Sequence, residues 1–213
     1  MRTDELVDLL ACNVEVVAPD SGARRFAWAL GAGALGAALL MAATLGVNPA
    51  LAAYVQQPTF WLKVVFVAAL AAIGLVMARR LSRPGARLAP MPAVLAMPVL
   101  AMWMIGAAAL LSAPAEARAG AFFGQTWAVC PLLVAMLAAP VFAGVIWAMK
   151  GLAPTRLRLA GAAAGFLSGA VGALVYCLHC PELAPSFIAF WYLLGMLIPT
   201  VVGAALGSRL LQW

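Results

Sequence analysis

The chain has 213 residues, of which 66% are hydrophobic and only 9% carry a charge. A soluble domain of this length needs a charged surface, with about a quarter of its residues charged. The composition therefore excludes a soluble domain. The formal net charge is +6, but the basic residues stand in small clusters between apolar runs. That distribution is typical of a membrane protein and not of a nucleic-acid-binding surface.

The N-terminal tail, residues 1–24, holds five of the seven acidic residues. Thr3 can cap a helix whose first turn is acidic, and leucines at helical spacing follow it. We therefore predict a short cytoplasmic amphipathic helix at roughly residues 3–17, before the breaking sequence that starts at Pro19. A tail that merely lies on the membrane is the alternative, but an acidic face is repelled by an anionic leaflet, which favours a protein partner. The candidate partner-binding residues are Asp4, Glu5, Leu6, Asp8, Leu9 and Leu10.

Six apolar stretches are each long enough to cross a bilayer as a helix, which takes roughly 20 residues. They lie at about 26–45, 60–78, 93–111, 127–149, 159–178 and 187–206. Aromatic residues near their ends, Tyr192 among them, are typical of interfacial belts, and glycines in the fifth stretch predict close helix packing. The sequence thus predicts an all-α, polytopic membrane domain of six transmembrane helices at residues 25–213.

Basic residues indicate the orientation of these spans. Eleven lie in the tail, in the second and fourth loops and after the last span, whereas the first, third and fifth loops hold only Arg118. By the positive-inside rule both termini lie in the cytoplasm, an N-in/C-in topology.

A group of sulfur and imidazole side chains would then lie at the outer ends of the fourth and fifth spans. Its members are Cys130, Cys177, His179 and Cys180, with Glu182 beside them. Three interpretations stay open. Cys130 could pair with Cys180 or Cys177 as a sensor of oxidants or soft metals, or Cys177 and Cys180 could be the redox pair of a quinone-linked thiol oxidoreductase. In the third, the cysteines are small apolar helix residues.

Lys63 is a charge about one turn inside the second span, so it is a functional candidate. Its closeness to the interface favours snorkelling to the headgroups, with pairing to Glu182 or Glu116 as the alternative. The spans contain no Asp or Glu, which argues against a small ion-coupled transporter. No nucleotide-binding or hydrolase motif occurs, so we predict a protein that is not an enzyme.

Several short motifs resemble one known family in their order and spacing over essentially the whole length. They are the acidic start at residues 1–11, Phe60-Trp61-Leu62-Lys63, Arg83-Pro84-Gly85, Trp127-Ala128-Val129-Cys130, Leu152-Ala153-Pro154-Thr155, Val175-Tyr176-Cys177-Leu178-His179-Cys180-Pro181-Glu182, Phe190-Trp191-Tyr192 and the last seven residues, 207–213. Together they resemble the NrsF-type negative regulators of sigma factor, a proteobacterial family of six-helix inner-membrane anti-sigma factors.

The resemblance implies a multi-pass protein of the bacterial inner membrane that sequesters an extracytoplasmic-function sigma factor through its cytoplasmic portion. Release would follow heavy-metal or oxidative stress, sensed by an outer-side cysteine pair. By motif this pair would be Cys130 and Cys180, with Cys177 an extra thiol that could replace Cys180 in it. His179, Glu182 and Lys63 match family positions as possible support. The resemblance implies no obligatory cofactor beyond a transient soft-metal ion at the cysteines, and no direct nucleic-acid binding.

Overall fold

The fold is described from a computed structural model of the whole chain, in which residues 3, 5, 12, 21–85 and 89–212 are described. Six helical segments among them are long and apolar enough to span a membrane, and these residues contain no β-strand. The all-α fold class with six candidate spans is therefore confirmed. The predicted tail helix lies almost wholly outside the described residues, and the topology stays a prediction.

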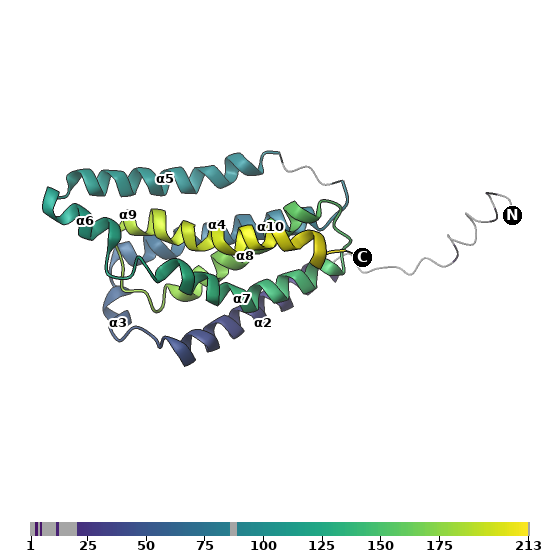
Figure 1. Cartoon of the computed structure of the whole chain (residues 1–213), viewed down its shortest axis with the longest axis horizontal. Coiled ribbons are helices and arrows are strands. Elements are labelled where there is room, and N and C mark those ends of the chain that lie inside the picture. Colours follow the sequence, from purple (N-terminus) through teal and green to yellow (C-terminus); the bar gives the residue numbers. More distant parts are fainter. Residues whose placement is uncertain (1–2, 4, 6–11, 13–20, 86–88, 213) are drawn as a thin grey trace.

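The spans depart from the predicted limits by only a few residues. They are α2 (Ser21–Thr44), α4 (Pro58–Leu81), α5 (Met91–Ser112), α7 (Cys130–Lys150), α8 (Leu157–Tyr176) and a sixth segment, Pro185–Leu210. The sixth segment consists of α9 (Pro185–Phe187), a π-helical turn η1 (Ile188–Tyr192) and α10 (Leu193–Leu210). Two short helices, α3 (Leu51–Tyr54) and α6 (Ala115–Phe123), lie in the connections after α2 and α5 (Figure 1).

The first span differs most from its prediction. We expected Ser21 and Gly22 to lie in a break before the membrane, but α2 already begins at Ser21. Its buried side chains recur every three or four residues from Phe26 to Met41, which is the spacing of one helix face. That face packs on α7 and α8.

The central helix is α8, which packs against α10, α7, α4 and α2. Its glycines allow backbones to approach closely. A Cβ placed on Gly161 or Gly165 would overlap the carbonyl groups of Gly203 and Pro199 in α10, and one on Gly172 would lie 2.8 Å from the backbone nitrogen of Ala138 in α7. The predicted packing role of these glycines is confirmed, since small residues bring membrane helices together.

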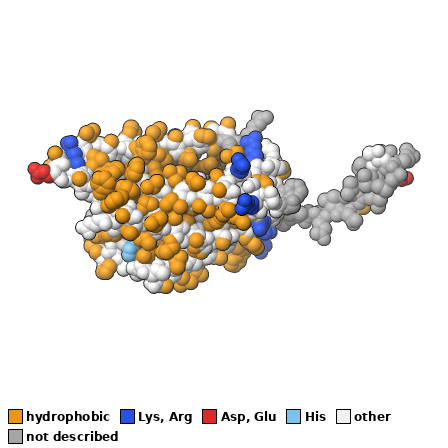
Figure 2. Space-filling view, in the orientation of Figure 1, with side chains coloured by type: hydrophobic (Ala, Val, Ile, Leu, Met, Phe, Trp, Pro, Cys, Tyr) orange, Lys and Arg blue, Asp and Glu red, His pale blue; other side chains and the backbone are white. Residues whose placement is uncertain are grey.

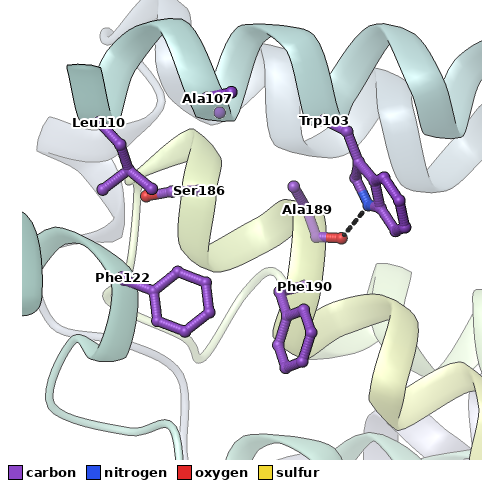
Figure 3. Close-up of a pocket in the computed structure, with 8 residues that line it drawn as sticks. Trp103, Ala107, Leu110, Phe122, Ser186, Ala189 and Phe190 are labelled. Atoms are coloured by element: carbon purple, nitrogen blue, oxygen red, sulfur yellow. Dashed lines mark hydrogen bonds between the residues drawn. The ribbon is translucent and has the colours of Figure 1, made fainter. Parts of the chain in front are cut away.

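Helix α5 lies along one flank of the bundle (Figure 1) and buries only Met91, Met102 and Gly106. Its second half is tied to the sixth span, because the Trp103 indole donates a hydrogen bond of 2.9 Å to the carbonyl of Ala189 in η1 (Figure 3). An apolar groove of about 350 Å³ lies beside this contact, between α5, α6 and the sixth span.

The two ends of the bundle differ in charge. Most of the described lysine and arginine side chains gather at one end, and the described flank is largely hydrophobic (Figure 2). We call the end where α4 finishes, with Arg79, Arg80 and Arg83, the arginine end. The opposite end, where α4 begins and α8 finishes, is the cysteine end.

We expect Gly165→Ala to destabilise the protein, because its Cβ would overlap the Pro199 backbone and well-packed interiors do not yield easily. The expected loss is about 1–3 kcal/mol, measured as a lower unfolding midpoint in detergent. The matched control is Gly31→Ala, a helical glycine with open space around its Cβ, which should be neutral or mildly stabilising. Equal midpoints in the two variants would contradict the close packing of α8 and α10.

Candidate functional site

The segment that follows α8, residues 177–182, carries most of the predicted site residues, and we call it the cysteine loop. The chain leaves the helix here because Pro181 has no N–H to donate and disfavours helical backbone at Cys180. Before that break, the Cys180 N–H still donates to the Tyr176 carbonyl at 2.9 Å. In this last turn the side chains of Cys177 and Cys180 point inward, and both are buried.

Three thiols and two tyrosines share the interior of the cysteine end. Cys130, the first residue of α7, is also buried. The Tyr176 hydroxyl lies beside the thiols of Cys130 and Cys180, and the Tyr192 hydroxyl lies beside those of Cys177 and Cys180. The two tyrosine rings are 5.8 Å apart.

The hydroxyls of Tyr176 and Tyr192 are buried without a well-aligned hydrogen bond. Such groups are rare in folded proteins, and each one calls for an explanation. We had taken Tyr192 for an interfacial residue, but it is fully buried, so that interpretation is wrong. The cysteine end therefore contains a cluster of soft and weakly satisfied polar groups inside an otherwise apolar bundle.

Lys63 is fully buried beside this cluster. Its ammonium donates to the carbonyl oxygens of Cys180 and Glu182, each at 3.1 Å. The snorkelling prediction is therefore wrong, and the reason is that two carbonyls of the cysteine loop face α4 and offer acceptors inside the protein. The contact with Glu182 is made to its main chain and not to its carboxylate.

The Glu182 carboxylate instead holds the connection between α6 and α7. Its Oε1 accepts a hydrogen bond of 2.7 Å from the Gln125 N–H and lies 3.5 Å from the Thr126 hydroxyl. Gly124 precedes these residues with a φ of +56°, and a Cβ there would collide with the Glu182 carboxylate. Glycine is thus required at 124 both by its backbone conformation and by the space that Glu182 takes.

His179 and its neighbour hold the connection between α2 and α3. The Nδ1 atom of His179 lies 2.9 Å from the Gly46 carbonyl oxygen, and a carbonyl only accepts, so Nδ1 carries the proton. The Asn48 N–H donates to the Leu178 carbonyl at 3.1 Å. The cysteine loop therefore binds three separate segments: the α2–α3 connection, α4, and the α6–α7 connection.

The three thiols of the cysteine end are free and buried. No disulfide joins the four cysteines, and no group of three or more His, Cys, Asp and Glu within the described part of the chain is arranged to hold a metal ion. For Cys177, one residue beyond the end of α8, burial raises the pKa to about 12, although the Lys63 ammonium acts to lower it. That thiol stays protonated at neutral pH, and protonated thiols react slowly.

The structure thus brings together the five residues predicted for the outer cluster with Lys63, and it adds Tyr176 and Tyr192. Tyr176 directly precedes Cys177 in the motif, which was a usable signal, whereas nothing in the sequence marked Tyr192 as buried. Among the predicted partner-binding residues of the tail only Glu5 is described, and the other five lie outside the described residues.

Comparisons with known proteins agree with the motifs. The model of the family "Negative regulator of sigma F" matches residues 10–213. The chain is 55% identical to the probable anti-sigma-F factor NrsF of Azospira oryzae over 213 residues, the full length of both proteins. It is 36% identical to the anti-sigma-F factor NrsF of Caulobacter vibrioides over a 225-residue alignment that also covers both in full. No solved structure gives a significant match. The chain therefore belongs to the family of negative regulators of sigma F.

Proposed function

We propose that this protein is an anti-sigma factor of the bacterial inner membrane that holds an extracytoplasmic-function sigma factor and releases it when thiols at the cysteine end are oxidised or bind a soft metal. Family membership supports the regulatory role. The sensing role rests on one observation: the cysteine loop, which holds three other segments, carries two buried thiols and lies beside the buried thiol of Cys130. On this proposal the protein has no catalytic activity.

The acidic tail is the segment that we propose binds the sigma factor. Its five carboxylates complement a basic surface, and leucines at helical spacing supply the apolar anchors that a helix uses in a partner's groove. Residues 21–24, the last residues of the tail, already belong to α2. A shift of the bundle at its arginine end would therefore reach the tail without a long linker.

The chemistry of the signal follows from the donor set. A hydroperoxide would oxidise Cys130 and Cys180 to a disulfide, taking up their two electrons and two protons and leaving as an alcohol and water. A soft metal ion would instead displace the thiol protons and bind the sulfurs. Both reactions draw sulfurs out of their present places beside the Tyr176 hydroxyl.

Lys63 is the proposed coupling residue. Its hydrogen bonds to the Cys180 and Glu182 carbonyls depend on the position of the cysteine loop. Lys63 also lies on α4, which runs to the arginine end. A loop that moves away from these bonds leaves a buried ammonium without acceptors, which is costly. The bundle is then expected to pass to a second arrangement rather than deform gradually.

Deletion of residues 2–20 is expected to abolish capture of the sigma factor, because it removes the acidic and apolar contacts but leaves all six spans. The measurement is co-purification of the sigma factor from detergent extracts of cells. Glu116→Gln, which neutralises a carboxylate in the α5–α7 connection, is the control and should retain capture. Unchanged capture by the deletion variant would remove the tail from the proposal.

The variant with Cys130→Ser and Cys180→Ser should still repress the target genes but should lose their induction by cadmium or hydroperoxide. Serine keeps the size of the side chain but neither forms a disulfide nor binds soft metals. Reporter expression is the measurement, and Cys12→Ser is the control. Full induction in the double variant would contradict sensing by these thiols, and loss of induction in the single variant Cys177→Ser would place Cys177 in the reactive pair.

Lys63→Met should loosen the cysteine loop, because it leaves two carbonyls without their donor at a cost on the order of 1–3 kcal/mol each. We expect faster labelling of Cys180 by a membrane-impermeant maleimide and higher uninduced reporter expression. Lys150→Met, at the arginine end, is the control for loss of a lysine charge. Wild-type labelling rates in Lys63→Met, at equal protein levels in the membrane, would show that Lys63 does not hold the loop.

A further inference from the structure

Two arginines in the last turn of α4 and one just beyond its end line one pocket. Arg79, Arg80 and Arg83 surround a cavity of about 190 Å³ together with Val76. Arg79 and Arg80 lie in the last turn of α4, and Arg83 follows Ser82, the residue that caps the end of this helix. All three side chains are exposed, and Arg79 and Arg83 also line a smaller hollow next to Phe26 of α2 and Leu152.

These three cations have no counter-charge among the residues that the structure describes. No hydrogen bond or ion pair joins their side chains to another described residue. Arg25 at the same end is different, because its guanidinium donates to the Trp147 carbonyl at 2.9 Å and lies 4.3 Å from the centre of the Trp147 ring. Glu116 and Glu182 belong to the cysteine end. Three adjacent positive charges repel one another, so an anion in their pocket is favourable.

The floor of the pocket is apolar and faces the region expected to be hydrocarbon. Val76 lies about one turn before Arg79 and Arg80, on the membrane side of them, and is 43% exposed. A site with guanidinium groups at its mouth and an exposed aliphatic side chain below them fits a molecule with a phosphate head and a hydrocarbon tail. A soluble acidic protein would contact the guanidinium groups at the mouth of the pocket but would leave the Val76 side chain without an apolar partner.

We propose that this pocket binds the headgroup of a phospholipid with two phosphodiester groups, of the diphosphatidylglycerol class, with the start of an acyl chain against Val76. Arginine forks bind phosphate oxygens in pairs, and clusters of basic residues at the cytoplasmic ends of spans attract anionic headgroups. The three charges at the end of α4, on Arg79, Arg80 and Arg83, are better matched by two phosphates than by one. This site is independent of the thiols and of sigma-factor binding.

The test is native mass spectrometry of the full-length protein in detergent with added diphosphatidylglycerol or phosphatidylcholine. The pocket variant combines Arg79→Gln, Arg80→Gln and Arg83→Gln. The matched control combines Lys150→Gln, Arg156→Gln and Arg158→Gln, which removes the same charge from equally exposed positions in and beside the α7–α8 connection. We expect wild type and control to retain diphosphatidylglycerol, and the pocket variant to retain about tenfold less.

A second variant, Arg79→Lys with Arg83→Lys, keeps the charge but loses the forked geometry, and it should weaken retention severalfold. Equal losses in the pocket variant and the control would mean a diffuse charge effect and would overturn the site. Equal retention of phosphatidylcholine by the wild type, or full retention of diphosphatidylglycerol by the pocket variant, would overturn it as well. A pocket variant that keeps the lipid but no longer captures the sigma factor would assign these arginines to the protein partner instead.

Discussion

The two hydrogen bonds of the buried Lys63 ammonium are the contact on which the cysteine end depends. Nothing else joins α4 to the cysteine loop as directly, and the loop in turn holds the α2–α3 and α6–α7 connections through His179 and Glu182. Loss of even one of the two hydrogen bonds is costly for a buried ammonium, because each acceptor replaces a large part of the hydration that the group has in water. On the proposed mechanism the loop would be either seated on Lys63 or displaced, which is the behaviour a switch requires.

Packing at the centre of the bundle explains how such a change could cross the membrane. Along α8 the neighbouring backbones are in contact at Gly161, Gly165 and Gly172, so α8 cannot bend towards or away from α10 by small increments. Interiors packed to this density change by discrete rearrangements of whole helices. On the proposed mechanism, a displacement of α4 against α8 at the cysteine end would be carried to the arginine end, where the tail joins α2.

Much of the fold could be predicted from the sequence because spans are local features: their length, their apolar composition and the charges between them are all written in consecutive residues. The parts that could not be predicted depend on tertiary contacts. Lys63 was expected at the interface because the sequence does not reveal that two carbonyls of a distant loop face it. Tyr192 was expected at the interface for the same reason, since its burial depends on the thiols and on the π-helical turn that carries it. Motif order did identify the cysteines, but only the structure adds the tyrosine hydroxyls between them.

If the thiols act as the proposed sensor, their burial determines the kind of signal to which the protein can respond. A fully buried thiol in a protonated state is protected from weak or bulky reagents, so a signal molecule must either wait for the cysteine loop to open or be small enough to enter it. The unsatisfied hydroxyls of Tyr176 and Tyr192 lower the cost of that opening, because water would supply the hydrogen bonds that the closed cluster withholds. Burial slows the reaction of the thiols, whereas the unsatisfied hydroxyls favour opening of the loop. The balance of these two effects would set the signal concentration at which the thiols react. Soft metal ions and small peroxides satisfy both conditions, since they are compact and gain strong bonds to sulfur once the loop has moved.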